Sequence, residues 1–264
     1  MLKAVGLEYE ANGDGEAVLL IHGGHVTDGF LPLMSEASLA NGYRLVRYRR
    51  RGYAGSDPVS GGFSVEEQAQ DALALMTHLG MERAHVVGHS YGGAIALQLA
   101  IDAPRLVRSL VLLEPAILAA DAAAAFFEAA KPVVALYRSG EVAGAIDLFM
   151  SAAGAADWRS AVANNVPGAA EQAEKDAATS FEFEIPALAE PLRDGDWSNR
   201  ISQPILYAIG SESGPVFEAA KQHFQSMIPS AEGAVLPGVN HLMQMRDPKL
   251  VAAAIADFLS RQPS

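Results

Sequence analysis

The sequence predicts an α/β fold, with a mainly parallel central sheet and helices on both faces. Short, largely apolar runs bounded by glycine or proline recur at residues 17–21, 43–48, 84–87 and 110–113. Runs of this kind are typical of strands that are covered on both faces. Amphipathic segments separate the runs, and this alternation of strand and helix predicts parallel strands joined by right-handed crossovers.

Two helices of the first half follow from local signals. Residues 65–79 carry apolar side chains at intervals of three and four, which predicts an amphipathic helix. Ser64 and Glu67 form a capping box at its start, and Gly80 suits the position after its end. The segment after Ser90 is apolar on nearly all sides, which predicts a buried helix that ends before Pro104.

The middle of the chain differs in character. Between residues 116 and 200 the strand-like runs vanish, and alanine and other helix formers dominate. The strand pattern resumes at 205–209, and a helix from about Val216 and a short strand at 234–236 follow. Asp247-Pro248 opens the last helix as N-cap and N1 residues. We therefore expect a core of residues 1–115 and 201–264 with a helical insertion at 116–200.

Composition narrows the function classes. The chain of 264 residues has a formal net charge of −12 and no cysteine, which excludes disulfide scaffolds and thiol nucleophiles. The acidic balance argues against nucleic acid and anionic membranes as partners. The most apolar run, 110–120, is interrupted by Glu114 and Pro115, so we expect no transmembrane span. The first residues lack the apolar stretch of a secretory signal, and we expect a cytoplasmic protein with a small-molecule substrate.

One motif carries chemistry in the context that it requires. Gly88-His89-Ser90-Tyr91-Gly92 follows a predicted strand and precedes the buried helix. A serine on such a strand-to-helix turn is held in a strained conformation with its hydroxyl exposed, and the helix N-terminus favours developing negative charge. The pattern therefore predicts Ser90 as a nucleophile rather than an incidental serine in a glycine-rich turn.

The chain resembles the α/β-hydrolase superfamily over nearly its whole length, including capped serine esterases and cofactor-free haloperoxidases. The segments that carry the resemblance are 20–24, 50–57, 87–93 and 237–241, which read LIHGG, RRGYAGSD, VGHSYGG and PGVNH. The resemblance implies the α/β-hydrolase fold, a serine nucleophile, a histidine near the C-terminus and an acid between them. It also implies a helical cap inserted after the sixth strand, where residues 116–200 lie, and neither a cofactor nor a metal.

A serine hydroxyl needs a base, because it is hardly ionised at neutral pH. His241 lies in a loop before the final helix, which is the family's position for that base. Acyl transfer also needs donors for the oxyanion. We expect these from the backbone N–H groups of Tyr91 and Gly24, with His25 as the next choice.

The position of the acid departs from the commonest family pattern. Most relatives carry an aspartate in the loop after the strand at 205–209, and the aligned residue here is Ser213. Glu114, at the tip of the strand at 110–113, is the preferred acid, since some family members carry theirs there and a buried carboxylate needs a partner. Glu212, one residue from the usual position, is the alternative. A structural carboxylate bonded to backbone N–H groups is the non-catalytic interpretation of Glu114.

The remaining polar residues favour structural roles. His22 is expected to hold the oxyanion turn by hydrogen bonds, and a metal pair of His22 and His25 lacks a third ligand of matching spacing. The arginine run is expected to pair with surface carboxylates rather than to bind an anion, and Arg49 replaces the family's usual aspartate. Its members are Arg47, Arg49, Arg50 and Arg51.

These residues support three hypotheses of function. The first is a serine hydrolase that cleaves a carboxylic ester or related acyl bond of a small to medium, apolar substrate. The second is perhydrolysis or hydrolysis of an activated C–C bond by the same triad. The third is a ligand-sensing protein that uses the hydrolase cavity and binds a protein partner. Candidates for substrate contact are His25, Met243 and Trp158, although most aromatic residues of the insertion are expected in its core.

Overall fold

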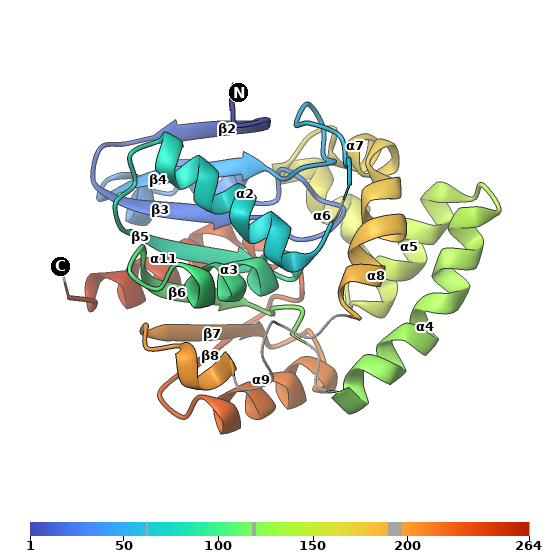
Figure 1. Ribbon diagram of the computed structural model, residues 1–264. Helices are drawn as coiled ribbons and strands as arrows, with labels where there is room; N and C mark the ends of the chain where they lie inside the picture. Colours follow the sequence, from blue (N-terminus) through green and yellow to red (C-terminus); the bar gives the residue numbers. More distant parts are fainter. Residues whose placement is uncertain (62, 118–119, 190–196, 264) are drawn as a thin grey trace.

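An eight-stranded sheet forms the centre of the protein in the computed structural model, which describes residues 1–61, 63–117, 120–189 and 197–263 (Figure 1). The strand order is β1-β2-β4-β3-β5-β6-β7-β8. The strands are β1 (Leu2–Ala4), β2 (Leu7–Asn12), β3 (Glu16–Ile21), β4 (Tyr43–Arg49), β5 (Ala84–His89), β6 (Val107–Leu113), β7 (Ile205–Gly210) and β8 (Glu232–Leu236). Five neighbouring pairs are parallel, namely β4–β3, β3–β5, β5–β6, β6–β7 and β7–β8. This confirms the predicted mainly parallel sheet.

The antiparallel part of the sheet is an N-terminal hairpin that the sequence patterns above did not predict. Strand β1 pairs with β2, and β2 pairs with β4, both antiparallel. In β2 the buried Leu7 and Tyr9 alternate with the half-buried Glu8 and Glu10. This period of two is the signature of a strand with one covered face.

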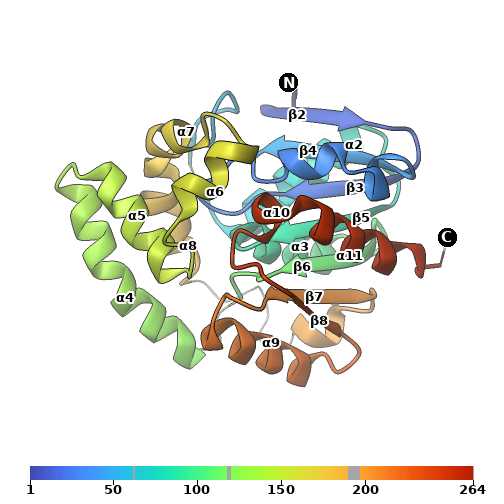
Figure 2. The same ribbon diagram turned by 180° about the vertical axis from the view of Figure 1, so that it is seen from behind.

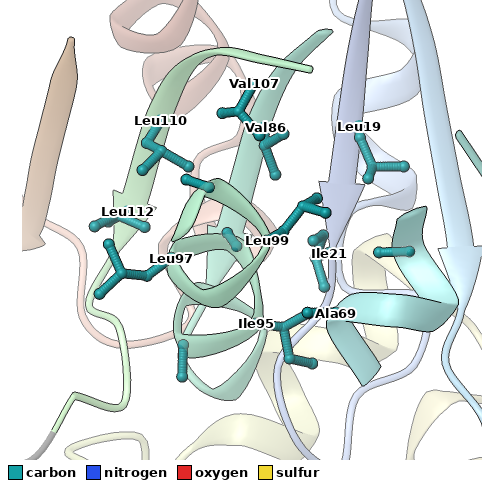
Figure 3. Close-up of a cluster of buried hydrophobic side chains, with 14 of the residues drawn as sticks. Leu19, Ile21, Ala69, Val86, Ile95, Leu97, Leu99, Val107, Leu110 and Leu112 are labelled. Atoms are coloured by element: carbon teal, nitrogen blue, oxygen red, sulfur yellow. The ribbon is translucent and has the colours of Figure 1, made fainter. Parts of the chain in front are cut away.

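Helices cover both faces of the sheet (Figures 1 and 2). They are α1 (Ala37–Ala40), α2 (Val65–His78), α3 (Tyr91–Asp102), α9 (Pro215–Met227), α10 (Met243–Arg246) and α11 (Pro248–Ser260), with a 3₁₀ helix η1 (Leu31–Ser35). Residues of α2, α3 and α9 share one buried cluster with one face of the sheet, and residues of α1 and α11 share another with the opposite face. Figure 3 shows Leu97 and Leu99 of α3 beside Val86, Leu110 and Leu112 of β5 and β6.

The predicted helix starts are present at the expected residues. Both halves of the capping box form at α2: Ser64 Oγ accepts from the Glu67 N–H, and the Glu67 carboxylate accepts from the Ser64 N–H. Asp247 caps α11 by accepting from the Leu250 N–H. These local hydrogen bonds explain why the sequence signals predicted the helices correctly.

A group of helices lies between β6 and β7 in the chain and beyond one end of the sheet in space (Figure 1). They are α4 (Ala120–Arg138), α5 (Val142–Ala152), α6 (Trp158–Asn165), α7 (Ala169–Lys175), a π-helix η2 (Thr179–Glu184) and α8 (Ile185–Ala187), followed by the 3₁₀ helix η3 (Trp197–Arg200). They have their own apolar cluster, which also takes in Val26 and Met245 of the core. We call this group the cap; the division at residues 115 and 200 into core and cap domains stays a prediction.

The apolar stretches within the described helices of the cap are short. Helix α4 has 19 residues and carries Pro132 inside it. Among the described residues, no helix combines the length and apolar character that a membrane crossing requires.

Candidate active site

Ser90 lies in the turn that joins β5 to α3, in a backbone conformation that non-glycine residues rarely adopt. Its φ is 51° and its ψ is −120°. The flanking glycines make the turn possible: a Cβ on Gly88 would lie 2.3 Å from the Gly92 carbonyl oxygen, and a Cβ on Gly92 would lie 2.2 Å from the Ile21 carbonyl oxygen. The glycines of the motif are therefore required by close backbone approach, and the strain falls on the serine.

Backbone hydrogen bonds tie this turn to the end of β6. The Ser90 N–H donates to the Leu113 carbonyl over 3.0 Å, and the Ala116 N–H donates to the Ser90 carbonyl over 2.8 Å. Gly93 permits the approach, because a Cβ there would lie 2.5 Å from the Cβ of Pro115. Ser90 and Glu114 are thus fixed relative to each other by the backbone alone.

Glu114 joins the end of β6 to the histidine loop. Its side chain is fully buried, and its φ is 44°, also in the left-handed region. One carboxylate oxygen accepts from the Gly210 N–H over 2.8 Å, and the other accepts from Nδ1 of His241 over 2.6 Å. A buried carboxyl group is costly without hydrogen-bond partners, and here both of its oxygens have one.

The alternative acid lies elsewhere. Glu212 is exposed, and the contact that holds it is a backbone hydrogen bond from its N–H to the Val239 carbonyl. Ser213, at the position where most relatives carry the acid, is buried, and its hydroxyl has no hydrogen-bond partner among the described residues. Of the two carboxylates considered from sequence, the structure pairs Glu114 with His241.

His241 is held on three sides. Its Nδ1–H donates to Glu114, which leaves Nε2 as the basic nitrogen. His89 donates from Nε2 to the His241 carbonyl over 2.8 Å, with the two rings 4.7 Å apart. Phe217 of α9 stacks on the imidazole with 4.9 Å between ring centroids, a contact that no sequence signal predicted. Ser90 Oγ makes no hydrogen bond in the described part of the chain.

The turn after β3 brings its backbone against Ser90. A Cβ on Gly23 would lie 3.1 Å from the Cβ of Ser90. The His25 N–H is engaged, since it donates to Ser180 Oγ of the cap over 3.3 Å. In the residues that the structure describes, the Gly24 N–H makes no hydrogen bond, and Tyr91 is the first residue of α3. Gly24 is therefore the better placed of the two donors considered for this turn.

His22 has the structural role expected of it. Its Nδ1–H donates to the Gly23 carbonyl over 2.7 Å, and its Nε2 accepts from the Arg50 N–H over 3.0 Å. Burial and the neighbouring Arg50 charge hold the pKa of His22 well below its ordinary value. Because both nitrogens bind backbone groups, neither is left for the metal pair with His25.

The three candidates for substrate contact are all buried. The His25 imidazole lies against Phe149 and Phe181 of the cap, and burial lowers its pKa to about 3. Neither of its ring nitrogens has a hydrogen-bond partner among the described residues. Met243 packs in the apolar cluster of α1 and α11, and Trp158 packs in the cap cluster with its indole N–H donating to Asp147. These contacts give Met243 and Trp158 packing roles, and substrate contact stays a prediction for all three.

The arginine run pairs with carboxylates, as expected, but not only at the surface. Ion pairs join Arg47 to Glu10 and Asp28, Arg49 to Glu8 and Asp28, Arg50 to Glu184, and Arg51 to Asp71. Arg50 and its cap partner Glu184 are both almost fully buried. No sequence pattern marks Glu184 as the partner of Arg50, because more than one hundred residues separate the two.

The chain is similar in sequence to proteins of known family over part of its length. The curated relatives include a putative carbamate hydrolase RutD of Variovorax paradoxus (strain S110), 39% identical over 110 residues, which are 40% of this chain and 41% of the relative. A putative non-heme bromoperoxidase BpoC of Mycobacterium tuberculosis (strain ATCC 25618 / H37Rv) is 36% identical over 110 residues, 41% of this chain and 42% of the relative. The chain thus spans about two fifths of the length of these relatives.

Similarity of structure extends further along the chain than similarity of sequence. The crystal structure of the enol-lactonase from Burkholderia xenovorans LB400 superimposes with a TM-score of 0.76 at 20% identity, covering 97% of this chain and 96% of that one. This likeness shows the shared fold. The family model described as "Alpha/beta hydrolase family" matches residues 18–254, nearly the whole chain and all the site residues described above. The chain is therefore a member of the alpha/beta hydrolase family.

Proposed function

We propose that this protein is a serine hydrolase that cleaves a carboxylic ester or a related acyl bond through an acyl-enzyme. The observation that carries the proposal is the buried hydrogen bond of 2.6 Å between Glu114 and His241, formed beside a strained serine at φ 51°. A base oriented by an acid, next to a nucleophile on a strand-to-helix turn, is the arrangement that activates a serine hydroxyl.

The proposed reaction assigns a step to each group. Ser90 Oγ attacks the acyl carbon while its proton passes to Nε2 of His241, and the Gly24 and Tyr91 N–H groups stabilise the oxyanion. The C–O bond to the leaving group then breaks as His241 returns the proton to that oxygen. Water repeats the attack on the acyl-enzyme, giving the free acid and restoring Ser90. Glu114 holds the His241 tautomer and stabilises the imidazolium.

The composition of the cap and the names of the relatives both support a substrate class. The cap cluster is rich in apolar and aromatic side chains, which favours a small to medium apolar acyl compound over a peptide or polysaccharide. The relatives described above are named for a carbamate and for a lactone, and both contain an acyl–oxygen or acyl–nitrogen bond of the kind proposed. We expect neither a cofactor nor a metal to be needed, and we expect the protein to act in the cytoplasm.

A second candidate function is perhydrolysis, and the bromoperoxidase relative favours it. In that reaction hydrogen peroxide replaces water as the acceptor of the acyl group and yields a peracid. The two functions use the same groups up to the acyl-enzyme. Comparing water and peroxide as acceptors under otherwise equal conditions therefore separates them.

The deciding experiment is the hydrolysis of p-nitrophenyl butyrate, followed from the subsecond range to steady state. Ser90→Ala is expected to lower kcat by between about 10⁴- and 10⁶-fold, because the nucleophile is lost. Ser226→Ala, on an exposed helical face with its hydroxyl bonded to the His223 carbonyl, is the matched control and is expected to match the wild type. A fluorophosphonate probe is expected to label the wild type and Ser226→Ala at Ser90 and to leave Ser90→Ala unlabelled.

The other outcomes have distinct meanings. Unchanged turnover by Ser90→Ala would refute the assignment of the nucleophile. A single burst of about one equivalent without turnover would refute hydrolysis as the function. It would instead favour a ligand-sensing role or an acceptor other than water.

A further inference from the structure

A buried guanidinium holds the turn that leads to Gly24. The Arg50 side chain is 1% exposed. It donates from Nε to the His22 carbonyl over 3.1 Å and from Nη2 to the Gly23 carbonyl over 2.9 Å. A planar guanidinium with two bonds to successive carbonyls fixes the orientation of the peptide planes between them. The direction of the next N–H, that of Gly24, depends on this contact.

The same guanidinium also contacts the second residue proposed to bind the oxyanion. It lies 5.1 Å from the ring centroid of Tyr91, the residue after Ser90. Gln68 links the two groups, since its side chain accepts from Arg50 Nη1 over 2.5 Å and donates to the Tyr91 hydroxyl over 2.9 Å. One buried cation thus bonds to the Gly23 carbonyl, which belongs to the same peptide group as the Gly24 N–H, and also contacts the ring of Tyr91.

The counter-charge comes from the cap. Glu184, the last residue of the π-helix η2, places one carboxylate oxygen 2.5 Å from Arg50 Nη1. Its other oxygen accepts from Ser180 Oγ over 3.3 Å and lies 3.0 Å from the position that a Cβ on Gly24 would occupy. Ser180 also accepts the His25 N–H and bonds to the Tyr53 hydroxyl over 2.8 Å. The cap therefore contacts two successive residues of the oxyanion turn: Glu184 lies beside Gly24, and Ser180 binds His25.

Stability alone gives little reason for such a pair. A fully buried ion pair contributes little compared with apolar side chains of the same volume, because both charges lose their hydration. Irregular π-helical turns are also frequent at functional sites. Since the proposed oxyanion lies beside Gly24, an unneutralised Glu184 carboxylate there would oppose it, and Arg50 removes that repulsion.

We propose that Arg50 and Glu184 form a positioning pair through which the cap sets the geometry of the oxyanion turn. Neither residue touches the reacting atoms; both act through Gly24 and Tyr91. This inference rests on the proposed function, because it assigns a purpose to the pair only where an oxyanion forms at Ser90.

The test compares substitutions of Arg50 and Glu184 with substitutions of a matched ion pair, Arg51 and Asp71. Arg50→Lys and Glu184→Gln are the test variants, and Arg50→Gln combined with Glu184→Gln removes both charges if a lone buried charge prevents folding. Arg51 binds Asp71 through two hydrogen bonds of 2.9 and 2.7 Å at a partly exposed site, and neither bond involves residues 22–24 of the turn. Arg51→Lys and Asp71→Asn are therefore the controls. Circular dichroism and thermal unfolding establish that each variant is folded.

The readouts are steady-state turnover of p-nitrophenyl butyrate and inhibition by a pentyl trifluoromethyl ketone. Ser90 Oγ adds to the ketone carbon, its proton passes to His241, and the hemiketal oxyanion occupies the site of the transition-state oxygen. We expect each test variant to lower kcat by about 10- to 100-fold, to leave KM within about threefold, and to weaken ketone binding in proportion. The controls are expected to stay within about twofold of the wild type.

Two results would overturn the inference while leaving the proposed function intact. One is a folded test variant with wild-type kcat and ketone affinity. The other is failure of all three test variants to fold, which would make the role of the pair structural. A wild type that neither turns over the ester nor is labelled at Ser90 would instead refute the proposed function itself.

Discussion

Two neighbouring strand ends differ in the way that they treat an acidic side chain. At the end of β6, Glu114 is buried, adopts a left-handed backbone conformation and binds both His241 and the Gly210 N–H. At the end of β7, Glu212 is exposed, and the buried Ser213 hydroxyl has no partner in the described ranges. Both ends lie beside Gly210, since a Cβ there would lie 2.8 Å from Ser213 Oγ.

Under the proposed function, we infer that the two strand ends are alternative positions for the acid that binds the histidine. A histidine at the edge of the sheet needs one carboxylate on its Nδ1 and gains nothing from a second, because two like charges close together oppose each other. With Glu114 in place, a small neutral side chain at residue 213 is the compatible partner. Variants that remove the charge from the end of β6, or move it to the end of β7, test this inference.

Removal of the charge at β6 is expected to have the largest effect. Glu114→Gln keeps the size of the side chain, but its amide can donate to Nδ1 and so favours the tautomer that protonates the catalytic nitrogen. We expect kcat for p-nitrophenyl butyrate to fall by about 10⁴-fold with little change in KM. Steady-state kinetics on the folded variant would check this, and a loss below about tenfold would contradict the assignment of Glu114.

Transfer of the charge to β7 is expected to recover part of that loss. Glu114→Gly suits the φ of 44° and leaves space, and adding Ser213→Asp places a carboxylate at the position used by most relatives. We expect the double variant to exceed Glu114→Gly alone in kcat by on the order of 10- to 100-fold. Glu114→Gly with Ser213→Asn, which has the same shape without the charge, is the matched control. Equal rates for the two double variants would show that the β7 end cannot serve the histidine.

Local signals were sufficient to predict most of the fold. The capping box at Ser64, the N-cap at Asp247 and the parallel strands form where the sequence predicts them, because each depends on neighbouring residues. The hairpin of β1 and β2 was missed, although the alternation of Leu7 and Tyr9 with glutamates was present in the sequence. Its partner, β4, is reached only after β3, so no short-range pattern specifies the pairing.

The contacts of the candidate site also differ in whether the sequence could predict them. The pairing of Glu114 with His241 could be anticipated, since a carboxylate at the end of a buried strand requires a partner. The stacking of Phe217 on His241 and the binding of Glu184 to Arg50 could not. Both depend on how helices outside the sheet settle in space, and packing of apolar helices is tolerant of many sequences.

The unpartnered serine at β7 predicts an effect on stability rather than on activity. Ser213→Ala removes a buried hydroxyl that has no hydrogen-bond partner among the described residues, so we expect the free energy of unfolding to rise by about 0 to 1 kcal/mol. Ser109→Ala is the matched control, because Ser109 is also buried but its hydroxyl bonds to His85 Nδ1 over 2.7 Å. It is expected to lower that free energy by about 1 to 3 kcal/mol. Urea unfolding of both variants would check the contrast, and a clear loss of stability in Ser213→Ala would show that the hydroxyl has a partner.

Glu212→Gln is expected to have the smallest effect on turnover, although Glu212 is only one residue from the usual position of the acid. Its side chain is exposed, so its charge is screened by water and salt, and Glu212→Gln leaves its backbone hydrogen bond to Val239 intact. We expect kcat and KM to remain within about twofold of the wild type. A fall comparable to that of Glu114→Gln would mean that the acid moves between the two strand ends during turnover. Glu212 is exposed, and in the described residues it makes no hydrogen bond to His241. Both observations argue that an acid is not catalytic merely because it lies close to the usual position in the sequence.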